Sequence, residues 1–133
     1  MLLLDTHVLV WMDADDLVLG PQARQAIRRA WSVGEVAVSA ISFWEVAMLA
    51  QRGRLHLPVP PDTWRADLLA AGVREIPLDG RMAVAAAGLE NLHRDSADRF
   101  IVASALACAG SLVTADAGIL EWTGELSRID ARR

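Results

Sequence analysis

The chain has 133 residues, 53% of them hydrophobic, which is enough for one compact domain over residues 1–133 and too little for two. No apolar run reaches the roughly 18 residues of a membrane helix, and Asp5 interrupts the first apolar run too early for a signal peptide, so we expect a soluble, cytoplasmic protein. The net charge of −4 excludes strong non-specific binding of nucleic acids through a basic surface, but not a nuclease that meets phosphate through a metal. The single cysteine, Cys108, excludes an internal disulfide.

The first half of the chain alternates between strand and helix signals. A short apolar run ended by Asp5, and a second one after Gly34, have the character of buried parallel strands. Pro21 suits the first turn of a helix, and a later helix is expected to begin with a capping box, because Ser42 is followed three residues later by Glu45. These signals predict strands at 2–4 and 36–38, and helices at 6–11, from 21 to Gly34, and from 42 to Gly53.

The second half continues the alternation after a proline-rich connector at 55–61. Asp79 and Asp95 have the side chains and positions of helix N-caps. The signals predict helices around Trp64, at 79–89 and at 95–109, and strands at 73–76, 112–113 and, at an edge of the sheet, 126–129. Strands that alternate with helices predict an α/β fold, with a mostly parallel sheet of four to five strands and helices on both faces.

Four acidic residues lie on otherwise apolar stretches, where an isolated buried carboxylate would be costly. Asp5 and Asp116 follow predicted strands, whereas Glu45 and Asp98 are expected in the first turns of helices that start from the same edge of the sheet. Open parallel sheets bind ligands beyond this edge. We therefore expect the four carboxylates to converge on a hard divalent cation, Mg²⁺ or Mn²⁺, which suits the hydrolysis of phosphodiester bonds by an activated water.

The histidines and tryptophans carry weaker signals. His7, His56 and His93 lack metal-ligand spacing and are expected to be structural or surface residues, although His7 and His93 adjoin two of the acidic motifs. The five tryptophans are expected to be core or interface anchors rather than platforms for base stacking. The arginines at 24, 28 and 29 share one face of a predicted helix, which is expected to be solvated.

The motifs MLLLDTHVLVW, ISFWEVA, HRDSADRFIVASAL and LVTADAGIL follow one another along nearly the whole chain. In this order and spacing they resemble the PIN-domain family and, within it, the VapC toxins of bacterial type II toxin–antitoxin pairs. The resemblance implies a three-layer α/β/α domain. It also implies an endoribonuclease that depends on Mg²⁺ or Mn²⁺ and arrests translation by cutting RNA.

Matching motif to motif, the resemblance implies four metal ligands and one hydroxyl residue that lines their pocket: Asp5, Glu45, Asp98, Asp116 and Thr114. The chain departs from many relatives at Ser96, where they have proline. Proline would preset the first turn of the helix, so its absence is expected to loosen that turn slightly and to leave the ligand in place.

The resemblance also implies three partners: an RNA substrate, a cognate VapB-like antitoxin that obstructs the site, and a second copy of the chain in a homodimer. Exposed apolar residues such as Trp11, Trp44 or Trp64 are candidates for these surfaces. Two alternatives stay open. One is a catalytically inactive PIN-fold module that binds RNA or antitoxin. The other is a signalling receiver domain, which the absence of lysine disfavours.

Overall fold

All neighbouring strands of the central sheet are parallel, and their order is β3-β2-β1-β4-β5. The computed structural model describes residues 1–133. The strands are β1 (Leu2–Leu4), β2 (Val36–Ser39), β3 (Arg74–Ile76), β4 (Ser111–Thr114) and β5 (Arg128–Asp130). The sequence therefore predicted the class of the fold, the parallel sheet and each of its strands to within a few residues.

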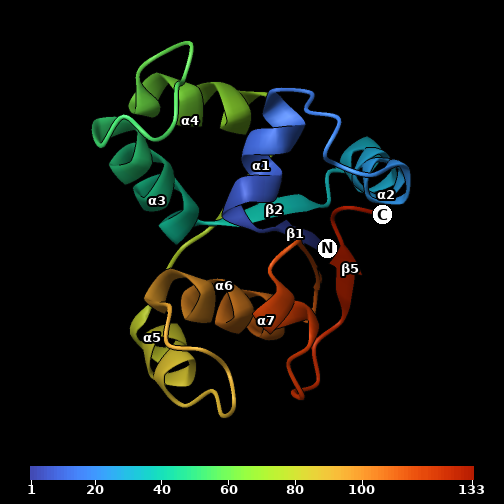
Figure 1. Ribbon diagram of the computed structural model, residues 1–133, viewed down its shortest axis with the longest axis vertical. Coiled ribbons are helices and arrows are strands. Elements are labelled where there is room, and N and C mark those ends of the chain that lie inside the picture. Colours follow the sequence, from blue (N-terminus) through green and yellow to red (C-terminus); the bar gives the residue numbers. More distant parts are fainter.

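Helices cover both faces of this sheet and complete three layers (Figure 1). Helices α1 to α4 lie on one side, and α5 to α7 lie on the other (Figure 1). Their bounds are α1 (Thr6–Asp13), α2 (Pro21–Ser32), α3 (Ala40–Gln51), α4 (Pro61–Ala70), α5 (Gly80–Ala87), α6 (Ser96–Ala107) and α7 (Ala117–Leu120). None of these helices has the length and apolar character needed to cross a bilayer.

Strand β1 shows why both layers need an unbroken apolar strand. Successive side chains of a strand point to opposite faces. Leu2 and Leu4 therefore join the core beneath α1, α2 and α4, whereas Leu3 joins the core beneath α6 and α7. All three leucines are buried. A sheet covered on both faces favours an unbroken apolar run in its central strand, and the first charge, Asp5, falls just beyond the end of β1.

The topology brings the ends of β1 and β4 together. From β1 the chain adds β2 and β3 on one side, then returns to add β4 and β5 on the other. The strand order reverses between β1 and β4, which is where open parallel sheets form ligand sites. Leu4 and Val113 are in register, so Asp5 and Thr114 leave the sheet side by side.

Helix α3 begins earlier than the sequence predicted. Ser39, at the end of β2, is its N-cap and accepts a hydrogen bond from the amide of Ile41. The predicted capping box is therefore wrong, because strand β2 turns into the helix without a loop. Ser42 lies inside the helix, and Glu45 lies in the second turn instead of the first. The N-caps predicted at Asp79 and Asp95 are confirmed by their bonds to the amides three residues later.

The tryptophans proposed for the surface differ in exposure. Trp64 is only 3% exposed and donates its Nε1 proton to Asp13 Oδ2 at 2.7 Å, so it is a core residue and not an exposed one. Trp44 on α3 is 57% exposed. Trp11 is half-buried and lies beneath the guanidinium of Arg132. The difference arises because the apolar face of α4 packs under α1 and α3.

Candidate active site

Asp5 is a buried carboxylate at the end of β1, only 1% exposed, and both of its oxygens have partners. Oδ1 accepts a hydrogen bond from the amide of Thr6 at 2.8 Å, which makes Asp5 the N-cap of α1. Oδ2 accepts the hydroxyl proton of Thr114 at 2.6 Å. Capping places the Asp5 side chain at the positive end of the helix dipole and satisfies one of the free amides of the first turn.

Thr114 connects Asp5 to Asp116. Its hydroxyl is completely buried at the end of β4 and also accepts a hydrogen bond from the amide of Asp116 at 3.0 Å. Asp116 then caps the short helix α7 through the amide of Ile119. Because hydrogen bonds are directional, these bonds hold Asp5 and Asp116 at fixed positions at adjacent strand ends.

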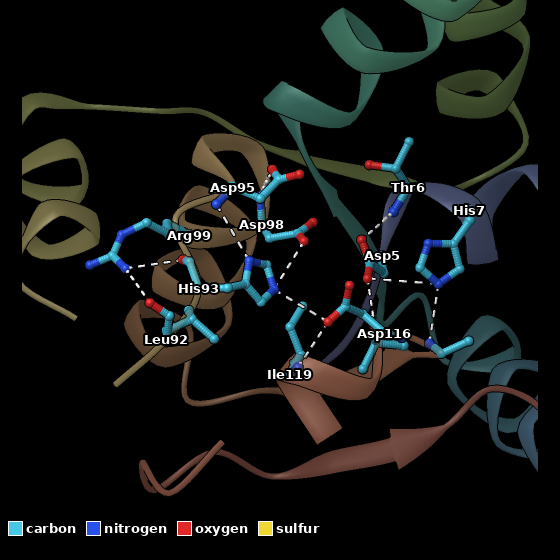
Figure 2. A network of polar contacts seen from close by, with 12 residues as sticks. Asp5, Thr6, His7, Leu92, His93, Asp95, Asp98, Arg99, Asp116 and Ile119 are labelled. Carbon is cyan, nitrogen blue, oxygen red and sulfur yellow. Dashed lines mark hydrogen bonds and ion pairs between the residues drawn. The ribbon is translucent and has the colours of Figure 1, made fainter. Parts of the chain in front are cut away.

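The tightest group of potential metal ligands contains Asp98, Asp116 and His93. Nε2 of His93 lies 3.3 Å from Asp98 Oδ2 and 3.3 Å from Asp116 Oδ1. One donor atom from each of the three residues lies within 4.8 Å of the others. Figure 2 shows Asp98 and His93 approaching from α6 and the loop before it, with Asp5 and Asp116 pointing toward them from the sheet.

Thr6 connects Glu45 to Asp5. The Thr6 hydroxyl donates to Glu45 Oε1 at 2.5 Å, while the amide of the same threonine donates to Asp5. The Thr6 oxygen also lies 2.9 Å from the hydroxyl of Ser42. Asp5 and Glu45 thus lie outside the tight ligand group: Thr114 links Asp5 to Asp116, and Thr6 links Glu45 to Asp5.

The electrostatics of Asp98 show that the acids act on one another. Burial, followed by the charges of Asp5, Asp95, Asp116 and Glu45, raises the pKa of Asp98 from 3.8 to about 8. Burial is also the main cause of the raised pKa of Glu45; a hydrogen bond from Thr6 opposes it, and nearby carboxylates add to it. A set of carboxylate oxygens in mutual repulsion is the donor chemistry that fits a hard divalent cation.

Three residues shape the site although no such role was predicted for them. Thr6 bonds both to its neighbour Asp5 and to Glu45, which lies 39 positions further along the chain, a link that no local pattern reveals. His7 accepts a hydrogen bond from the amide of Ala115 at 3.1 Å and so ties α1 to the segment after β4. His93, expected to be structural or at the surface, instead lies between two acids; its place next to the motif RDSADR was the available signal.

Arg99 fixes the segment that carries His93. Its guanidinium donates five hydrogen bonds to backbone carbonyls, and two of these carbonyls belong to Leu92 and His93 (Figure 2). Arginine alone offers so many donors in a rigid plane. The side chain next to Asp98 in the sequence therefore points away from the acids and holds the loop in front of α6.

The geometry agrees with comparisons to known proteins. The sequence model of the PIN domain matches residues 2–123. Ribonuclease VapC22 of Mycobacterium tuberculosis is 39% identical over 115 residues, which cover 86% of this chain and 85% of VapC22. VapBC2 from Rickettsia felis, bound to a DNA fragment from their promoter, has the same fold with a TM-score of 0.71 at 14% identity, over 96% of both chains.

A toxin–antitoxin complex from Klebsiella pneumoniae also shares the fold, with a TM-score of 0.66 at 19% identity over 98% of both chains. The structural matches establish the three-layer fold, and the two sequence matches span most of the chain. From the fold and from these matches we conclude that the protein belongs to the PIN domain family and, within it, to the VapC group.

Proposed function

We propose that the chain is an endoribonuclease toxin of a type II toxin–antitoxin pair, which hydrolyses RNA phosphodiester bonds with Mg²⁺ or Mn²⁺. The observation that carries this proposal is the Asp98 carboxyl at the carboxyl edge of the parallel sheet. Its pKa rises to about 8 because it is buried and because four other acids lie near it. Such a cluster needs a cation for all its members to stay ionised. The identity of 39% with a protein named as a ribonuclease supports RNA as the substrate.

The residues have separate roles in this proposal. Asp5, Asp98 and Asp116 would hold the divalent ion, with Glu45 completing the pocket. When bound, such an ion attracts a phosphate oxygen and lowers the pKa of a water ligand. Thr114 is a positioning residue, because its hydroxyl sets the orientation of Asp5. Thr6 occupies one oxygen of Glu45, which leaves the other for a ligand or for a proton from water.

We further propose a VapB-like antitoxin and a homodimer as partners. The structural neighbours include toxin–antitoxin complexes, which supports an antitoxin partner. A surface groove of about 540 Å³ lies between α1, α2 and α4 and would accept apolar side chains of an antitoxin segment. Its apolar walls are formed by Met12, Ile27, Trp31, Val59, Trp64 and Leu68. Co-purification with the product of the adjoining reading frame tests the antitoxin, and sedimentation equilibrium tests the dimer.

Cleavage of isolated RNA by the purified full chain tests the activity. We expect cutting with Mg²⁺ or Mn²⁺ and none with excess chelator. Asp5→Asn and Asp98→Asn should each lower the rate by at least about 100-fold, since each removes a charge from the ion site. Glu125→Gln is the matched control, because Glu125 is an exposed carboxylate. An antitoxin-binding chain that cuts no RNA with either metal would instead be an inactive binding module.

A further inference from the structure

His93 is the one nitrogen donor in the tight ligand group, and its ring orientation is determined. The amide of Asp95 donates to its Nδ1 at 3.4 Å, which leaves Nε2 as the nitrogen that faces the acids. Nε2 lies at the same distance, 3.3 Å, from Asp98 Oδ2 and Asp116 Oδ1. The ring therefore presents one nitrogen to two carboxylates at once.

These two distances fit ligands of one ion better than an ion pair. Hydrogen bonds between a charged imidazole and a carboxylate contract to about 2.7–2.9 Å, and one Nε2 proton cannot point at both oxygens. Neighbouring ligands of an octahedral divalent cation, by contrast, lie about 3 Å apart. The spacing around His93 is close to that second value on both sides.

Gly118 provides the space for the ring. Its backbone is ordinary helix within α7, with no positive φ, so conformation does not require glycine here. A Cβ at this position would lie 2.5 Å from Cδ2 of His93, 3.2 Å from its Nε2 and 3.1 Å from Asp116 Oδ1. Real Cβ atoms essentially never approach a neighbour to 2.5 Å. The chain thus leaves a slot against α7 that the imidazole fills.

The backbone of His93 is held independently of the slot. Arg99 donates to the carbonyls of Leu92 at 3.0 Å and of His93 at 3.2 Å. Two separate constraints, one on the backbone and one on the ring, place Nε2 at the acids. A histidine that only filled space would not require both its backbone and its ring to be held in the orientation that faces two carboxylates.

We propose that His93 is a metal ligand through Nε2 and that it makes the site of this chain select Mn²⁺ over Mg²⁺. The inference rests on the proposed function, since it refines the metal site of that function. Mg²⁺ prefers hard oxygen ligands and keeps its waters, whereas Mn²⁺, a first-row transition ion that also favours carboxylates, accepts an imidazole nitrogen among them more readily than Mg²⁺ does. Replacing one oxygen position with nitrogen therefore shifts the preference of the same carboxylate pocket toward Mn²⁺.

Pulsed electron paramagnetic resonance of the Mn²⁺-loaded full chain tests the ligand directly. Electron spin-echo envelope modulation detects nitrogen bonded to Mn²⁺. We expect the nitrogen signal in the wild type and in His56→Gln, a matched control at an exposed histidine, and its loss in His93→Gln. Gly118→Ala, which keeps every donor but fills the slot, should weaken or remove the signal.

Calorimetric titration of the same proteins tests the selectivity. His93→Gln should lower the affinity for Mn²⁺ by about tenfold or more, while the affinity for Mg²⁺ changes by less than about threefold. Circular dichroism and thermal melts check that the variant is folded, and Gly118→Ala gives a second route if it is not. An equal loss for both ions would overturn the proposed selectivity.

The outcomes separate this inference from the function beneath it. If the wild type cleaves RNA with Mn²⁺ but shows no nitrogen signal, or if His93→Gln retains the signal, His93 is not a ligand and the ribonuclease proposal stands. If the wild type neither binds Mn²⁺ nor cleaves RNA with any divalent ion, both proposals fall.

Discussion

Thr114 donates its hydroxyl proton to Asp5 across 109 positions of the sequence, at 2.6 Å and in a fully buried place. Each of the two side chains supplies a hydrogen-bond partner that the other needs in this buried place. Asp5 Oδ2 has this hydroxyl as its hydrogen-bond donor, and the hydroxyl in turn receives the amide of Asp116. The bond joins the first and fourth strands in the chain at the point where the candidate metal site begins.

Removal of this hydroxyl is expected to cost stability. Thr114→Val keeps the shape but leaves a buried carboxylate oxygen without its donor, which should lower the free energy of unfolding by about 1–3 kcal/mol. Urea denaturation in the presence of chelator measures the change. Thr123→Val, at an exposed threonine, is the control and should stay within about 0.5 kcal/mol of the wild type. Equal stabilities for the two variants would contradict the role of Thr114.

The stability of the metal-free protein is expected to depend on pH through Asp98. Its pKa is raised from 3.8 to about 8, so the folded state holds this proton more tightly than the unfolded state. The resulting stabilisation is complete below about pH 4 and is lost as the pH rises through about 8. The raised pKa of Glu45 has the same sign.

Thermal melts in chelator between pH 5 and pH 9 measure this effect. The melting temperature should fall toward high pH in the wild type and fall less in Asp98→Asn, which has no proton to lose at this position. Saturating Mn²⁺ should reverse the trend, because a metal displaces the proton and binds better as the pH rises. A wild-type profile identical to that of Asp98→Asn would show that the Asp98 proton does not contribute.

Arg99 should be sensitive even to a conservative change. Arg99→Lys keeps the charge but cannot reach five carbonyls with one ammonium, so we expect a loss of about 1–3 kcal/mol in the free energy of unfolding and faster amide exchange around 87–95. Arg94→Lys, an exposed arginine in the same segment, should have little effect. Hydrogen exchange measured by mass spectrometry reports the loop directly. Unchanged exchange in Arg99→Lys would argue against this anchoring.

The two tryptophans of α3 and α4 should lose very different amounts of stability on truncation. Trp64→Ala removes a side chain that is 3% exposed and should cost about 3–5 kcal/mol of stability. Trp44→Ala removes one that is 57% exposed and should cost less than about 0.5 kcal/mol. Equilibrium unfolding of both variants makes the comparison. A large loss from Trp44→Ala would indicate that this face is covered, as in a dimer.

Ser96→Pro is expected to stabilise the chain. Ser96 is the first residue of α6, and Asp95 before it has φ −59° and ψ 114°, an extended backbone that a following proline requires. The substitution should raise the free energy of unfolding by about 0.4–1 kcal/mol by restricting the unfolded chain. Thermal melts measure the gain, and the affinity for Mn²⁺ should not change. A destabilised variant would show that the Ser96 amide has a role in the folded state.

Much of the fold followed from local patterns, because buried parallel strands need unbroken apolar runs and helix caps need particular side chains. Asp95, for example, was predicted as the N-cap of α6, and its side chain accepts the amide of Asp98. Ser39 was not predicted as the N-cap of α3, because the capping pattern formed by Ser42 and Glu45 begins three residues further on. A capping pattern identifies a helix, but the length of the preceding strand decides which serine caps it.

The positions of site residues that follow from strand order could be predicted, whereas the positions that depend on side-chain packing could not. The approach of Asp5 and Asp116 follows from adjacent strand ends. The position of His93 depends instead on the missing side chain of Gly118 and on the carbonyls bound by Arg99. Such contacts between distant segments leave no periodicity in the sequence.

The span of 109 residues between Asp5 and Thr114 also has a consequence during synthesis. A growing chain on the ribosome carries Asp5 from the start but lacks its hydroxyl partner until β4 has emerged. Every truncated product that ends before this strand therefore lacks a complete ion pocket. The proposed activity therefore requires a chain that has been synthesised through β4 and on to Asp116.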